Sequence, residues 1–229
     1  MRRWLPMLMW LAMSPAMAGA QSLPPWKYPT TLANDPNTSR LFFAPTGRAL
    51  KRGEAYVSVF EALLPSFQVG VTDFFSIGGG TPAIPFEGAR RPFWITPKLQ
   101  VLNTAKTSAS IGAIRIFNEG GGRDRIAYGV VTHGGASGAV TVGGGYSYGP
   151  GGAGRSPLIM IGAEHGMRTG LKFVTENYKF EDGGLLGGGL RYYSDKWSAD
   201  FGMMVFVAKY SDFSPQISAA PIVNVARRF

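Results

Sequence analysis

The stretch "AVTVGGGYSYGPGG" at Ala139–Gly152 is the feature that most constrains the fold of this chain. Val140 and Val142 fall on one parity, whereas Thr141 and Gly143 fall on the other. Side chains of a β-strand point to opposite faces in turn, so one face is large and apolar and the other is small and polar. A soluble sheet usually covers its wet face with longer polar side chains. The pattern is typical of a barrel strand with lipid outside and a lumen inside.

The N-terminus, "MRRWLPMLMWLAMSPAMAGAQ", has the pattern of a secretory signal peptide. Arg2 and Arg3 precede a short apolar run, and an A-x-A site ends at Ala20. We expect a signal peptide at residues 1–20 and a mature chain that starts at Gln21. The apolar run is too short to span a membrane comfortably, so we expect an exported protein.

Composition agrees with an exported β-protein that contacts lipid. The 229 residues include 32 glycines and no cysteine, with 13% aromatic and only 16% charged residues. Disulfides and thiol chemistry are therefore excluded. The formal charge is +9, but the basic residues are scattered and no basic helix is predicted. We expect no nucleic-acid partner, and instead contacts with outer-membrane lipid and lipopolysaccharide.

The rest of the chain predicts hairpins and no helix. Short turns alternate with longer segments, as in outer-membrane barrels with short periplasmic turns and longer outer loops. We expect the loops around Gly120–Gly122 and Gly149–Gly154 to face outwards. Twelve strands are predicted: Glu54–Ala62, Ser66–Thr72, Phe74–Pro82, Phe93–Leu102, Thr107–Phe117, Arg125–Thr132, Ala139–Tyr148, Leu158–His165, Gly170–Tyr178, Leu185–Tyr193, Trp197–Val207 and Ala219–Arg227.

The predicted fold class is all-β, an antiparallel transmembrane β-barrel of about twelve strands, with ten as the alternative count. The barrel occupies residues 54–229, and residues 21–53 form an N-terminal periplasmic extension. Three strands, with "SIGAIRIF", "RIAYGVV" and "LIMIGAEH", are apolar on both parities in places, and Pro97 interrupts another. A soluble β-sandwich or a lipocalin-like barrel would also bury one face of its strands, so both remain alternative interpretations of the sequence.

Several segments resemble bacterial outer-membrane β-barrel proteins. They are "VTDFFSIGGG" at 71–80, "SGAVTVGGGYSYG" at 137–149 and the terminal "ARRF". The segment "NTSRLFFAPTGRALKRGEAY" at 37–56 also resembles a group of small, uncharacterised barrels of that class. The resemblance covers most of residues 37–229. It implies a bacterial outer-membrane location and brings no catalytic residues.

The C-terminal strand fits the assembly signal that this resemblance implies. Barrels of the class end in an aromatic residue, which the barrel-assembly machinery recognises together with apolar residues at alternate positions. Val223, Val225 and Phe229 fit that pattern, whereas Arg227 on the same parity departs from it.

Candidate lumen-lining residues follow from the polar parity of the strands. Their charges predict either a path for polar or anionic solutes or a packed interior held shut by ion pairs. The candidates are Gln68, Thr96, Lys98, Arg115, Lys172, Glu176, Arg191 and Asp200.

No catalytic residue, metal site or cofactor is predicted. The chain has two histidines, His133 and His165, and His133 does not show the H-x-S spacing of outer-membrane phospholipases. We expect a non-enzymatic barrel, first a small passive pore for polar or anionic solutes. The alternatives are a structural or surface-binding barrel with a filled lumen and, less favoured, a lipid-modifying enzyme. The sequence does not predict an oligomeric state.

Overall fold

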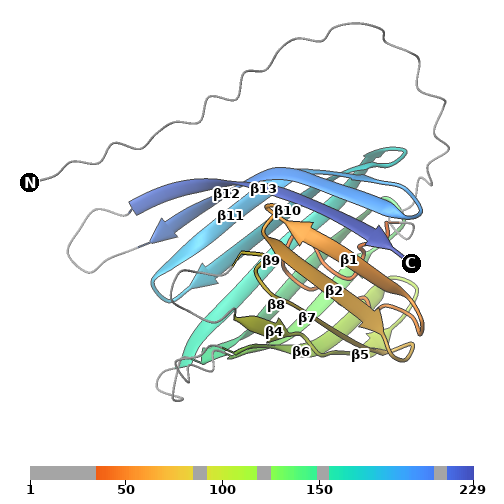
Figure 1. Ribbon diagram of the computed structural model, residues 1–229, viewed down its shortest axis with the longest axis horizontal. Coiled ribbons are helices and arrows are strands. Elements are labelled where there is room, and N and C mark those ends of the chain that lie inside the picture. The colour runs from red at the N-terminus through yellow and green to blue at the C-terminus, as the bar shows by residue number, and fades with distance from the viewer. Residues whose placement is uncertain (1–34, 85–91, 118–124, 149–154, 209–215) are drawn as a thin grey trace, which may run out of the picture.

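The structure, a computed structural model, describes residues 35–84, 92–117, 125–148, 155–208 and 216–229. Its strands form one antiparallel sheet, which closes into a barrel because the first strand pairs with both the second and the last (Figure 1). Among these residues, no helix is long and apolar enough to cross a membrane. The signal peptide, the expected outer loops around Gly120–Gly122 and Gly149–Gly154, and residues 21–34 of the expected extension lie outside the described residues.

The barrel confirms the predicted fold class and strand count. The thirteen strand segments make twelve full strands of the barrel wall, which we call staves, because β4 and β5 are two halves of one such strand. The segments are β1 Ala55–Phe60, β2 Leu64–Gly70, β3 Phe75–Gly80, β4 Phe93–Ile95, β5 Lys98–Asn103, β6 Thr107–Phe117, β7 Arg125–Gly134, β8 Gly138–Tyr148, β9 Arg155–Arg168, β10 Leu171–Phe180, β11 Gly183–Tyr193, β12 Trp197–Ala208 and β13 Gln216–Arg228.

The break between β4 and β5 has a local cause. Thr96 still exchanges backbone hydrogen bonds with Gly78, at 2.8 and 3.3 Å. Pro97 follows and has no N–H to donate, although its carbonyl accepts a bond of 3.1 Å from Ala113. The stave therefore continues past the proline with its direction kept and its ladder interrupted.

The two faces of the wall differ as the opening stretch predicts. Val140 and Val142 of β8 are each 48% exposed on the outer face, whereas Thr141 between them is buried inside. On β12, Phe201 is 69% exposed and Asp200 is buried. The apolar residues therefore face outwards, where lipid would meet them, and the polar residues face inwards.

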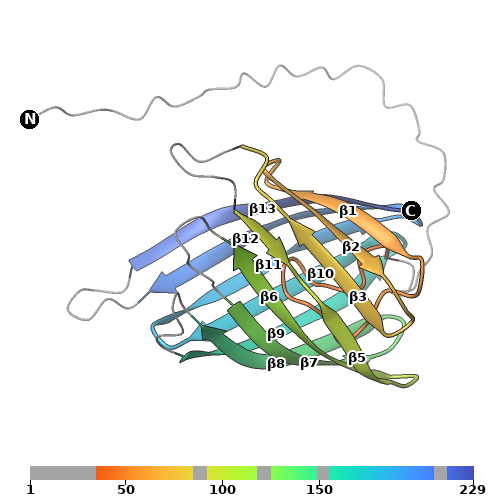
Figure 2. The same cartoon turned by 60° about the horizontal axis from the view of Figure 1, so that its bottom comes forward.

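Residues 35–50, which we call the inner segment, run inside the barrel (Figure 2). The sequence placed this stretch in an extension outside the barrel, and the structure differs. The segment doubles back on itself, with an antiparallel bridge between Arg40 and Pro45. At its end the backbone turns through Gly53 into β1, with Gly53 bonded to Gly70 at 2.9 Å. The lumen is therefore partly filled by a segment of the same chain.

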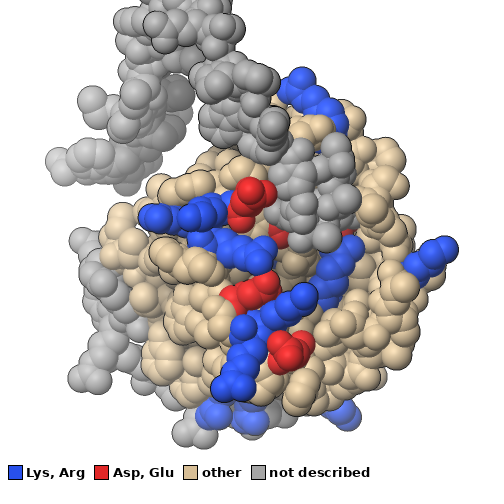
Figure 3. Space-filling model, turned by 90° about the vertical axis from the view of Figure 1, so that its right-hand side faces the viewer, with Lys and Arg blue, Asp and Glu red and all other residues tan. Residues whose placement is uncertain are grey.

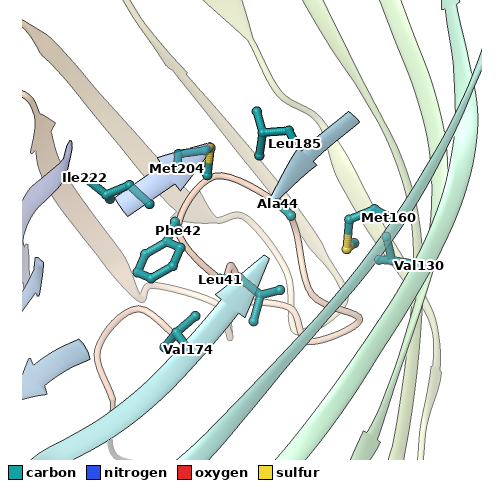
Figure 4. Close-up of a cluster of buried hydrophobic side chains, with 9 residues drawn as sticks. All are labelled: Leu41, Phe42, Ala44, Val130, Met160, Val174, Leu185, Met204 and Ile222. Carbon is teal, nitrogen blue, oxygen red and sulfur yellow. The ribbon is translucent and has the colours of Figure 1, made fainter. Parts of the chain in front are cut away.

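Apolar side chains at the tip of the inner segment pack against the inner face of the wall (Figure 4). Leu41, Phe42 and Ala44 come from the inner segment. The wall supplies Val130, Met160, Val174, Leu185, Met204 and Ile222 from β7 and from β9 to β13. Strands β7 and β9, two of those that read as apolar on both parities, thus bury their inward apolar residues against this tip.

Candidate functional site

Six ionised side chains form a continuous chain of alternating sign between the inner segment and the wall. Two come from the inner segment, and β9, β10, β11 and β12 give one each. In order of contact they are Arg48, Glu164, Lys172, Asp35, Arg191 and Asp200. Cations and anions balance within this set, which we call the charge chain.

The centre of the charge chain is tightly bonded and buried. Lys172 Nζ lies 2.5 Å from Glu164 Oε2 and 2.6 Å from Asp35 Oδ2. Arg191 Nη1 lies 2.9 Å from the same Asp35 oxygen, and Arg191 Nε lies 2.5 Å from Asp200 Oδ1. Arg191 also donates to three backbone carbonyls of the inner segment. Buried charges are tolerated only when they are paired and hydrogen-bonded, so each member depends on its neighbours.

This arrangement keeps the Asp35 carboxylate ionised. Burial alone would raise the pKa of Asp35, but Lys172 and Arg191, with a hydrogen bond from the Asn37 N–H, lower that pKa below its usual range. The Asn37 bond is 2.8 Å long. The inner segment is therefore anchored at its first described residue by a charge that persists at neutral pH.

Glu176 of β10 holds the tip of the inner segment. Its Oε2 accepts the backbone N–H groups of Phe42, Phe43 and Ala44 at 2.8, 3.0 and 3.0 Å. Its Oε1 accepts the hydroxyl of Tyr178 at 2.6 Å. The side chain is fully buried, so one carboxylate satisfies three amides that would otherwise lack partners in the lumen.

Lys98 of β5 does the converse for carbonyl groups. Its Nζ donates to the backbone oxygens of Ser39, Thr46 and Arg48 at 2.9, 3.4 and 2.6 Å. Lys98 is also buried. Lys98 on β5 and Glu176 on β10 thus bind the backbone of the inner segment from different staves.

Gly47 brings the backbone of the inner segment close against the wall. Its N–H donates to Thr132 Oγ1 at 2.8 Å, and its carbonyl accepts from Gln100 and Ser110 at 2.9 and 2.8 Å. A Cβ at this position would lie 2.1 Å from the backbone oxygen of Ser108. Only glycine therefore fits without displacing the segment.

The inner segment leaves one side of the lumen partly open. A cavity of about 270 Å³ lies between it and the staves of β1 to β7. Arg40 and Lys98 supply cations, and Ser66, Gln68 and Thr96 supply uncharged polar groups. Rings of Tyr56, Phe60, Trp94 and Tyr128 make up much of the remaining wall. No Asp or Glu is among the described residues that line this cavity.

Charged side chains also gather at the end of the barrel that carries the short turns and the C-terminus. Figure 3 views this end and shows Lys and Arg beside Asp and Glu across its middle. Arg228 pairs with Glu54 at 2.6 Å there, where β13 meets the start of β1. Opposite charges lie next to each other, so this end is not dominated by one sign.

Most of the predicted lumen residues lie inside the barrel. Lys98, Lys172, Glu176, Arg191 and Asp200 are buried against the inner segment or its partners. The Gln68 and Thr96 side chains are joined by a bond of 3.4 Å and line the cavity. The structure brings the charged residues together as anchors of the inner segment, not as an open charged path.

Arg115 was predicted to line the lumen, and this prediction is wrong, because Arg115 lies on the outward parity of β6. Ser110, on the opposite parity, bonds to Gly47 inside, and Ile114 and Ile116 line the cavity. Arg115 instead stacks over the ring of Phe117, with 4.6 Å from its Cζ to the ring centroid. The register of β6 was ambiguous because its inward residues are apolar.

The sequence did not predict Asp35, Arg48 or Glu164 as lumen-lining residues. Asp35 and Arg48 fall in the stretch expected to lie outside the barrel, and Glu164 lies on a strand with weak alternation. The signal that could have found them is "NTSRLFFAPTGR", since Leu41 and Phe42 need an apolar partner that a solvated extension would not supply.

The two histidines lie at the turn end and do not face each other. His133 is exposed on β7, where its Nδ1 is 2.8 Å from Thr107 Oγ1, and His165 is exposed on β9. Within the described ranges, no group of three His, Cys, Asp or Glu side chains could hold a metal ion.

The residues of the expected assembly signal lie on the outer face, Val223 and Val225 on β13 and Phe229 directly after it. Val223, Val225 and Phe229 are 40%, 44% and 68% exposed. The Arg227 guanidinium lies between two rings, 5.2 Å from the Trp197 centroid and 5.1 Å from that of Phe229.

No protein-family model matches the sequence, and the comparison with curated proteins found no match. Solved structures do match in fold. A KdgM porin has a TM-score of 0.55 and 7% identity over 77% of this chain and 98% of its own. A NanC porin has a TM-score of 0.56 and 7% identity over 76% and 98%. A KdgM porin in complex with disordered oligogalacturonate has a TM-score of 0.54 and 6% identity over 77% and 96%. The chain therefore has the closed twelve-strand barrel fold of bacterial outer-membrane porins.

Proposed function

We propose that this protein is a narrow outer-membrane channel for small polar or anionic solutes, with the inner segment as its constriction. The observation that carries the proposal is the cavity beside the inner segment, whose described lining has two cations and no acid. The porin fold of the neighbouring structures supports the outer-membrane location and the channel class.

The two sides of the lumen have different roles in this proposal. On the side of β9 to β12, the charge chain and Glu176 seal the inner segment to the wall. On the side of β1 to β7, the cavity provides the solute path. Positive charge without acid raises the local concentration of anions, so the channel should favour anions over cations.

The test is single-channel recording of the purified barrel in planar lipid bilayers. We expect small, anion-selective conductance steps from the wild-type protein. Gly47→Ala should enlarge the steps, because its Cβ would lie 2.1 Å from the Ser108 oxygen and push the inner segment off the wall. Gly129→Ala is the matched control, since a Cβ there meets nothing within 4 Å.

The second candidate is a structural barrel with a permanently filled lumen. It is favoured by the burial of the charge chain and by the many hydrogen bonds between wall and inner segment. An absence of conductance from both the wild type and Gly47→Ala, with both proteins folded, would overturn the channel and support this alternative.

A further inference from the structure

Arg40 is the cation of the cavity whose hydrogen-bonding groups are least used by the protein. Its Nε donates to Asn37 Oδ1 at 2.9 Å, and its Nη2 reaches Asn224 Oδ1 only at 3.5 Å. Among the described residues, no carboxylate pairs with it within 4.0 Å. Lys98 differs, because three backbone carbonyls occupy its donors.

The electrostatic state of Arg40 agrees with a missing counter-charge. Burial lowers the pKa of Arg40 from its ordinary value by more than nearby Tyr56, Asp200 and Glu176 raise it. An arginine side chain nevertheless stays protonated in a protein, so Arg40 remains a cation. A bound anion would therefore gain from a cation that is already partly buried and held in place.

Aromatic rings fix the guanidinium of Arg40 and shape the space around it. Its Cζ lies 4.3 Å from the Phe60 ring centroid and 5.2 Å from that of Tyr56. Phe43 stacks on Phe60 with 4.6 Å between centroids. Stacking leaves the edge of a guanidinium plane available for bidentate bonds to a carboxylate.

The size and lining of the cavity limit the rest of the ligand. Its volume of about 270 Å³ falls just below the range of roughly 300–1,000 Å³ that is usual for ligand pockets. Trp94, Tyr128, Ile114 and Ile116 add flat or apolar surface. Among the described residues, the lining adds hydroxyl groups, the amide of Gln68 and the ammonium of Lys98. A single ring fits this surface better than a flexible polar chain.

We propose that the cavity binds a small carboxylate with one flat ring, whose carboxylate pairs with Arg40 and whose ring packs on the aromatic wall. This inference rests on the proposed function, because it names the solute class of the same cavity. The inner segment then supplies the anchor of the site as well as the constriction.

The experiment is isothermal titration calorimetry of the refolded full chain in detergent, with benzoate as the probe. Acetate tests the carboxylate without a ring, and benzyl alcohol tests the ring without a charge. We expect saturable benzoate binding that exceeds both by about tenfold or more, the worth of a charge-assisted bond. Equal binding of acetate overturns the ring, and equal binding of benzyl alcohol overturns the pairing with Arg40.

Two variants separate the site from the fold. Arg40→Gln should weaken benzoate binding about tenfold or more, whereas the exposed Arg52→Gln should leave it unchanged. Ile116→Trp fills the cavity and keeps Arg40, so it should weaken benzoate binding even if Arg40→Gln fails to fold. Benzoate binding unaffected by Ile116→Trp overturns the site.

Bilayer recording with benzoate separates this inference from the proposed function. If the protein conducts, but benzoate neither blocks the current nor carries it, the ligand class is overturned and the channel proposal stands. Saturable binding that requires Arg40 in a protein without conductance overturns the channel and supports the ligand class.

Discussion

Arg191 of β11 and Asp35 of the inner segment lie 2.9 Å apart, both fully buried, across 156 positions of sequence. This pair joins a stave of the wall to a segment that belongs to no stave. Together with the Lys172–Asp35 and Arg48–Glu164 pairs, it couples the fold of the barrel to the position of the inner segment.

Replacement of Arg191 should destabilise the barrel strongly. Arg191→Met leaves Asp200 without its cation and Asp35 with Lys172 alone, and breaking a buried pair from one side costs about 3–5 kcal/mol. The measurement is urea unfolding of the protein refolded in lipid vesicles. Arg168→Met, at an exposed arginine of β9, is the matched control. An equal loss in both variants would contradict a structural role for the charge chain.

Acid should remove the stabilisation that comes from Asp35. Its pKa is lowered in the folded state, so its contribution is present above the ordinary carboxylate pKa of about 4 and is lost as pH falls further towards the folded value. The difference in unfolding free energy between wild type and Asp35→Asn should therefore be constant near neutral pH and shrink below about pH 4. Other carboxylates titrate in both proteins and cancel. A difference that grows on acidification would mean that Asp35 is not held ionised.

Two neighbouring glycines of β8 should respond differently to the same substitution. A Cβ at Gly143 would lie 2.6 Å from Val130 Cγ1 and 3.1 Å from Met160 Cε, inside the barrel. At Gly144 the nearest atom, the carbonyl oxygen of Leu158, is 3.6 Å away. Gly143→Ala should cost about 1–3 kcal/mol through overpacking, and Gly144→Ala should cost little. Unfolding in the same vesicles measures both, and equal costs would argue against a packed interior.

The barrel wall could be predicted from sequence because the face on which a strand residue lies depends only on its position in the alternating pattern of that strand. Strand parity alone assigns Val142 to the outside and Thr141 to the inside, and the structure agrees. The same rule found Arg191, Asp200, Lys172 and Glu176 as inward residues. The pattern within a strand, however, does not predict which group an inward charged side chain will contact.

The inner segment could not be predicted in the same way. Its residues have no strand period, and their partners lie far away in sequence, as with Phe42 and Glu176 at 134 positions. Where that segment packs on the wall, inward positions become apolar, and parity loses its meaning. Ile114 and Ile116, which line the cavity beside the inner segment, are also apolar and inward, and this is why Arg115 between them was assigned to the wrong face.

The last prediction concerns Phe229 at the end of the chain. Its N–H donates to the carbonyl of Ala55 at 2.9 Å, which extends the seam between β13 and β1, and its ring is 68% exposed on the outer face with Val223 and Val225. Deletion of Phe229 removes that bond and the exposed ring, so we expect less folded, heat-modifiable protein in the outer membrane. Gel mobility of unheated samples measures the folded fraction.

Two further variants at this end separate the ring from the charge beside it. Phe229→Tyr should assemble normally, because it keeps both the ring and the backbone bond. Arg227→Tyr should preserve or raise the folded amount, since the guanidinium of Arg227 only stacks on Trp197 and Phe229 and a ring can take its place at a membrane interface. Normal assembly without Phe229 would contradict the prediction, because it would show that assembly requires neither the terminal ring nor the backbone bond from Phe229 to Ala55.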